Sequence, residues 1–100
     1  MKYHGFDIEE SPNAQKAKCL IKNNDYALII TDLVMEHEFA GIEVLDSAIA
    51  KDKTLKVIIL TAAKHVANMS EKKVFKWIDK SSEDVYNTII KTVKLALNEI

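Results

Sequence analysis

The stretch ALIITDLVM, residues 27–35, is an apolar run that stops on a carboxylate. Its first four residues are all apolar, a pattern typical of a strand that is buried on both faces of a parallel sheet. Asp32 follows directly after this predicted strand. Two interpretations are open: Asp32 is an ordinary acid in a loop, or it is a reactive or metal-binding carboxylate. The residues at the ends of the other predicted strands provide the evidence that separates these two interpretations.

Composition limits the classes of protein to which the chain can belong. Its 100 residues, 48% apolar and 29% charged, predict a single domain of ordinary globular composition over residues 1–100. The formal net charge of −1 gives no reason to expect nucleic acid or a membrane as a partner. The lone Cys19 excludes an internal disulfide, and no apolar run approaches the roughly 20 residues of a membrane span. We therefore expect a cytoplasmic protein.

The hydrophobic period switches repeatedly along the chain between that of strands and that of helices. Strands are predicted at Lys2–Glu9, Tyr26–Thr31, Leu55–Leu60 and Val74–Ile78. Helices are predicted from Ser11-Pro12 to Lys22, after the loop at 36–41, weakly over Ala62–Lys73, and from a cap at Ser81 or Ser82 onward. The resulting order, β-α-β-α-β-α-β-α, favours right-handed crossovers. It predicts an α/β fold in which helices cover both faces of a four-stranded parallel sheet.

Three polar residues end three of the predicted strands, namely Asp32, Thr61 and Lys80. Ligands of such sheets bind outside the carboxyl ends of the strands, so an acid, a hydroxyl and a cation are expected to meet there. This combination suits a carboxylate that accepts a phosphoryl group as a nucleophile. The hydroxyl and the ammonium group would hold the transferred oxygens. Each residue alone is weak evidence, and the coincidence of all three is stronger.

The same residues lie within motifs that resemble those of the response-regulator receiver domains of two-component signalling. LIITDLVM resembles the phosphoacceptor strand of the family, and GIEVL resembles the start of the helix that follows it. VIILTA resembles the strand that carries the switch hydroxyl, and WIDKS resembles the last strand and its loop. The resemblance implies that Asp32 is the phosphoacceptor, that Thr61 and Lys80 contact the phosphoryl group, and that Trp77 is the switch aromatic residue.

The resemblance also implies a flavodoxin-like sheet, which in the family has five strands. The motifs align so that this chain begins after the first strand and the first helix of the family. The incomplete sheet leads to two expectations: the Lys2–Glu9 strand slides inward and pairs with Tyr26–Thr31, or an open apolar edge is covered by a second copy or another protein. A homodimer or a strand-complementing partner is therefore predicted.

In the family, a pair of acids at the end of the first strand holds Mg²⁺, and this chain lacks that pair. Substitute ligands beside Asp32 would be Glu9 and Glu10, at the end of the first predicted strand, and Glu36 in the following loop. Oxygen ligands of this kind suit Mg²⁺. The alternative is that all three glutamates are solvated loop acids.

Two functions of different classes remain open, and neither makes the chain an enzyme. In the first, the chain accepts a phosphoryl group from a histidine kinase on Asp32, and Thr61 and Trp77 relay the change to the face of the last strands and helices. In the second, it is a degenerate receiver that acts as a phosphorylation-independent interaction or assembly module. A small hydrolase or phosphatase on the same sheet is a third and less favoured hypothesis.

Overall fold

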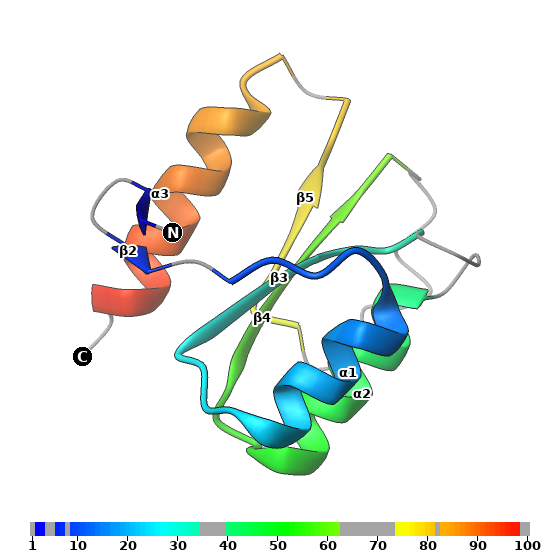
Figure 1. Cartoon of the computed structure of the whole chain (residues 1–100). Helices are drawn as coiled ribbons and strands as arrows, with labels where there is room; N and C mark the ends of the chain where they lie inside the picture. Colours follow the sequence, from blue (N-terminus) through cyan, green and yellow to red (C-terminus); the bar gives the residue numbers. More distant parts are fainter. Residues whose placement is uncertain are drawn as a thin grey trace.

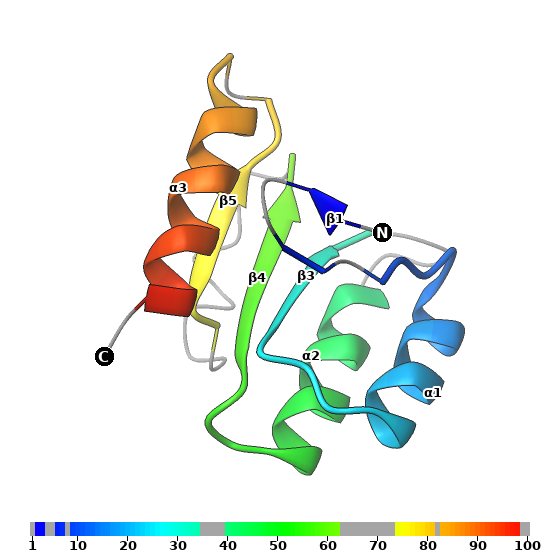
Figure 2. The same ribbon diagram turned by 60° about the vertical axis from the view of Figure 1, so that its left-hand side comes forward.

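The fold is built around a three-stranded parallel sheet, and a computed structural model describes residues 2–3, 6–7, 9–34, 40–62, 74–81 and 83–98. The sheet contains β3 (Leu28–Asp32), β4 (Lys56–Thr61) and β5 (Lys76–Asp79) in that order. Helices α1 (Ala14–Asn23) and α2 (Ala40–Lys51) lie on one face, and α3 (Val85–Asn98) lies on the other (Figures 1 and 2). The α/β class and the flavodoxin-like arrangement predicted from the sequence are confirmed.

The prediction of a single strand over Lys2–Glu9 is wrong. The backbone there makes two short strands, β1 (Lys2–Tyr3) and β2 (Phe6–Asp7), which pair with each other antiparallel and form a separate sheet. The described residues therefore contain three parallel strands instead of four. Of the two alternatives for this segment, pairing with β3 does not occur among the described residues. The sequence contains a signal against one continuous strand, because the glycine at position 5 is a residue typical of turns.

Each face of the sheet has its own apolar core, because alternate strand residues point to opposite faces. On the α2 face, the buried cluster is made of Leu33, Leu45, Ala48, Val57 and Ile59, with Ile29 and Trp77 packed against it. On the α3 face, it is made of Ile58, Ile78 and Val93, with Leu28 and Ile89 packed against it. The central strand β4 thus contributes to both cores, as the uninterrupted apolar run predicted.

The predicted helix caps differ from those in the structure. Helix α1 begins two residues later than expected, because Asn13 is the N-cap and its side chain accepts a hydrogen bond from the Lys16 amide at 2.8 Å. Ser81 does not cap α3, because its hydroxyl donates to Asp79 at 2.6 Å and the helix begins at Val85. Ser82 and the predicted helix over Ala62–Lys73 lie outside the described residues, apart from Ala62.

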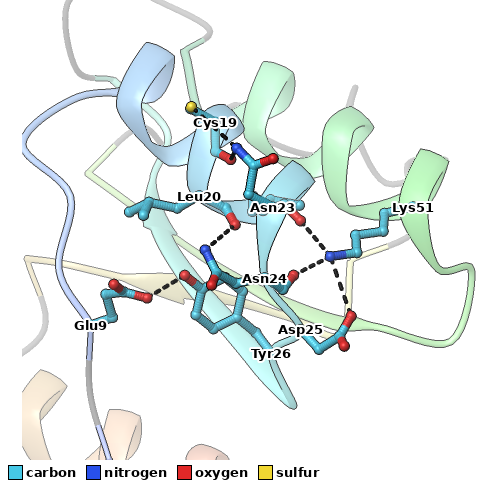
Figure 3. A network of polar contacts seen from close by, with 9 residues as sticks. Glu9, Cys19, Leu20, Asn23, Asn24, Asp25, Tyr26 and Lys51 are labelled. Carbon is cyan, nitrogen blue, oxygen red and sulfur yellow. Dashed lines mark hydrogen bonds and ion pairs between the residues drawn. The ribbon is translucent and has the colours of Figure 1, made fainter.

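Helices α1 and α2 are joined by side chains at both ends of their contact. Lys18 on α1 pairs with Glu43 on α2 at 2.8 Å. At the other end, the Lys51 ammonium donates to the carbonyls of Ile21 and Asn24 and lies 3.3 Å from the Asp25 carboxylate (Figure 3). A cation beside the carboxyl end of a helix is favourable because it complements the helix dipole. These contacts hold α1 and α2 together on one face of the sheet.

Candidate functional site

The carboxyl ends of the three parallel strands bring the predicted site residues to one edge of the sheet. Asp32 is the last residue of β3 and lies in register with Leu60, the neighbour of Thr61. Thr61 is the last residue of β4 and lies in register with Asp79, the neighbour of Lys80. Asp32 is therefore one register position from Thr61, and Thr61 is one register position from Lys80. The predicted convergence of Asp32, Thr61 and Lys80 is what the pairing produces.

The charged pair at this edge is a direct contact. Lys80 Nζ lies 3.1 Å from Asp32 Oδ1, and the two side chains are 48% and 40% exposed. An ion pair with this much solvent around it contributes about 0 to 1 kcal/mol to stability. The pair therefore contributes little to the stability of the fold, and both charged groups remain accessible to a ligand.

Thr61 is held beside this pair by the backbone. Its residue is 5% exposed, and its carbonyl accepts a hydrogen bond from the Lys80 amide at 2.9 Å. The turn after β5 is fixed in addition by the Asp79 carboxylate, which accepts hydrogen bonds from the Ser81 amide at 2.9 Å and from its hydroxyl at 2.6 Å. These bonds set the direction in which the Lys80 side chain leaves the sheet.

Gly41 is a site residue that the sequence analysis did not single out for its geometry. It lies in the first turn of α2, where its amide donates to the Leu33 carbonyl at 2.8 Å. A Cβ at this position would lie 2.3 Å from the Asp32 carbonyl oxygen and 2.8 Å from Leu33 Cα. Only a residue without a side chain allows the helix to approach the backbone of Asp32 so closely. The signal in the sequence was a glycine inside a helical pattern, where glycine is otherwise unfavourable.

Trp77 lies on β5, in register with Ile59, and packs partly buried against the core cluster on the α2 face. The structure thus places it three residues before Lys80 but among apolar side chains. Met35 and Glu36, which follow β3 in the sequence, lie outside the described residues.

Comparison with known proteins identifies the family to which this chain belongs. The model of the response regulator receiver domain matches residues 1–93. The chain belongs to this family. No curated protein is significantly similar to this receiver domain in sequence.

Two solved structures share the architecture of this receiver domain. The response regulator protein TrrA from Thermotoga maritima, in complex with Mg²⁺ and BeF, is 28% identical with a TM-score of 0.78; the match covers 93% of this chain and 79% of TrrA. A fusion protein that contains the trimeric coiled coil of yeast Spc42 is 21% identical with a TM-score of 0.75, and the match covers 94% of this chain and 64% of the fusion. The first is a likeness to a response regulator, and the second shows the fold alone.

Of the acids predicted to hold Mg²⁺, the structure describes Glu9, Glu10 and Asp32. Glu9, Glu10 and Asp32 line a common groove, but no group of three metal-ligating side chains gathers among the residues that the structure describes. The Glu9 carboxylate accepts a hydrogen bond from the Tyr26 hydroxyl, and Asp32 is paired with Lys80. The described donors therefore do not form a set that fits Mg²⁺ in this receiver domain.

The carboxylate of Glu9 changes the pKa of the Tyr26 hydroxyl. The hydrogen bond to Glu9, followed by loss of hydration and the negative charge of Glu9, raises the pKa of the Tyr26 hydroxyl from 10.0 to about 12. The contact ties the segment before α1 to the start of β3, so Glu9 is held near the amino end of that strand. None of the described helices is both long and apolar enough to span a membrane.

Proposed function

We propose that this receiver domain accepts a phosphoryl group on Asp32 from the phosphohistidine of a histidine kinase. A carboxylate oxygen of Asp32 forms the new bond to phosphorus, and the bond between phosphorus and the imidazole nitrogen of the donor breaks. The electron pair of that bond returns to the imidazole, which takes up a proton. The observation that carries the proposal is the contact of 3.1 Å between Lys80 Nζ and Asp32 Oδ1 at an accessible sheet edge.

The other residues at this edge have separate roles in the proposal. Lys80 shifts from the Asp32 carboxylate to the transferred oxygens, whose negative charge it balances. The Thr61 hydroxyl approaches the same oxygens from the next strand. Trp77, the second residue of β5, senses the resulting movement of the Lys80 turn. No step is assigned to Mg²⁺, because the described donors do not form a set for it, and the metal requirement is an outcome of the test.

The test is the intact mass of the protein after incubation with acetyl phosphate, with and without Mg²⁺. The proposal predicts an adduct of one phosphoryl group on the wild type and none on Asp32→Asn, which keeps the shape of the side chain but removes the nucleophile. An adduct that forms equally with and without Mg²⁺ agrees with the donor set of the described residues. Absence of an adduct under every condition contradicts the proposal.

A second candidate function is a phosphorylation-independent interaction or assembly module. The observation that favours it is the position of β3, which pairs with β4 on one side and with no described strand on the other. An open strand edge is a template for association with another chain. Under this function, Asp32→Asn leaves partner binding unchanged, whereas substitutions along β3 weaken it. A second copy of this chain or another protein would complete the sheet.

A further inference from the structure

The open side of β3 forms the floor of a groove of about 750 Å³. Residues of α1 and α2, among them Leu20, Ile21 and Val44, line it on one side, and residues of α3 from Tyr86 to Leu97 line it on the other. Apolar side chains dominate both walls. Ile30, in the middle of β3, is 42% exposed there, whereas Ile58 beside it on β4 is fully buried. The groove is within the size range of clefts that bind ligands.

The backbone of β3 determines which shape of ligand fits this groove. The Leu33 amide donates to the Leu60 carbonyl on β4 at 2.9 Å. Because the backbone groups of successive strand residues point to alternate sides, residues 29, 31 and 33 face β4, and Leu28, Ile30 and Asp32 face the groove. Leu28 and Ile30 present backbone hydrogen-bonding groups there at the spacing of an extended chain, whereas the Asp32 carbonyl accepts a hydrogen bond from the Thr31 hydroxyl at 3.0 Å and lies against the first turn of α2. An added strand matches this spacing, and a helix does not.

The charges along the groove limit the sequence of such a strand. Among the described residues that line the groove, three are acidic, Glu9, Glu10 and Asp32, and none is basic. Asp32 lies at the carboxyl end of β3, and Glu9 is held near its amino end by Tyr26. Lys80 pairs with Asp32 at 3.1 Å, but the Asp32 side chain remains 40% exposed, so an accessible carboxylate lies at each end of the groove. An occupant with a positive charge near each end is complementary to it.

We propose that this groove binds an extended apolar segment of another protein, with a basic residue near each end, as a strand added to the edge of β3. The five residues of β3 span about 16 Å at ~3.3 Å per residue, so five residues between the two basic ones fill the edge. Side chains on one face of the added strand pack against α1 and α2, and those on the other face pack against α3. The inference deepens the interaction-module function and requires no phosphorylation of Asp32.

The test uses the full chain and three blocked peptides labelled with a fluorophore, with binding read as fluorescence anisotropy. The peptide KIVVIVK carries five apolar residues between two lysines and is expected to bind saturably. EIVVIVE, with the charges reversed, is expected to bind about tenfold more weakly. KIVPIVK, in which proline removes an amide donor and restricts the backbone, is expected to lose most of the affinity. Equal binding of all three peptides, or no saturable binding of KIVVIVK, overturns the proposal.

Variants of the chain locate the binding. The double variant Glu9→Gln/Glu10→Gln is expected to reduce the preference for lysine over glutamate ends, whereas the matched pair Asp46→Asn/Glu83→Gln, away from the groove lining, keeps it. Ile30→Thr, which retains a β-branched residue on the exposed edge, is expected to weaken KIVVIVK binding. A concentration-dependent dimer that Ile30→Thr abolishes in sedimentation would assign the groove to a second copy and overturn the proposed occupant. Because the phosphoryl adduct on Asp32 is measured separately by mass, failure of either proposal is recognised independently.

Discussion

Strands β3 and β4 have similar sequences, LIITD and KVIILT, and very different surroundings. In β4, residues Val57 to Ile59 are at most 1% exposed, because β3 and β5 flank the strand and helices cover both faces. In β3, Ile30 is 42% exposed, because only one side of the strand is paired among the described residues. An apolar run therefore predicts a strand, whereas the position of that strand in the sheet determines how much of it is buried.

The largest effect on stability is expected from substitutions at Ile58 and Ile30, which lie in register on β4 and β3. Ile58→Ala on β4 removes a side chain that is fully buried and is expected to lower the free energy of unfolding by about 3 kcal/mol. Ile30→Ala on β3 removes the same atoms from a half-exposed site and is expected to cost about 1 kcal/mol. Urea unfolding followed by circular dichroism measures both. Equal losses would show that the edge of β3 is covered as completely as β4.

The next effect concerns the close approach of α2 to the end of β3. Gly41→Ala places a Cβ against the backbone of Asp32 and Leu33, which cannot move aside as a flexible side chain could. We expect a loss of about 2 kcal/mol in the free energy of unfolding and slower phosphorylation of Asp32. Asp46→Ala, at an exposed position of the same helix, is the control and should change neither quantity. An unaltered Gly41→Ala protein would show that the helix does not press on the acceptor strand.

A smaller effect is expected from the network between α1 and α2. Lys51→Met keeps the length of the side chain and removes the charge that serves the carbonyls of Ile21 and Asn24. The expected loss in the free energy of unfolding is about 1 to 2 kcal/mol. Lys91→Met, at an exposed position of α3, is the matched control and should cost less than about 0.5 kcal/mol. Equal losses in the two variants would contradict the role given to Lys51.

The smallest effect is a dependence on alkaline pH. The folded pKa of Tyr26 is about 12 against an ordinary value of 10.0, so the folded state keeps its proton while the unfolded state loses it. Stability from this contact is therefore full below pH 10 and is lost as the pH rises toward 12. Titration by phenolate absorbance should show a high transition that disappears in Tyr26→Phe and moves down in Glu9→Gln. A wild type whose tyrosines all titrate near 10 would exclude the contact.

Much of the site could be predicted from local sequence because strand ends are local features. Asp32, Thr61 and Lys80 each follow an apolar run, and parallel pairing then brings such ends to one edge without further information. The groove could be predicted only in part: the motifs left open whether the edge of β3 is paired or exposed, and the sequence did not show that β1 and β2 pair with each other. That outcome depends on competition between pairing with β3 and pairing within the segment. The close contact of Gly41 with the backbone of Asp32 and Leu33 could not be predicted, because the sequence does not show which atoms lie next to a glycine.

We propose that the contact between Lys80 and Asp32 marks a phosphoryl-transfer site. The most direct measurement is the residue-level position of the adduct formed with acetyl phosphate, read by mass spectrometry of fragments and compared among wild type, Lys80→Met and Lys76→Met. We expect a phosphoryl group on Asp32 in the wild type, formed at an unchanged rate in Lys76→Met, which changes an exposed β5 residue, and about tenfold more slowly in Lys80→Met. A phosphoryl group at another residue, or no adduct on any of the three proteins, would contradict it.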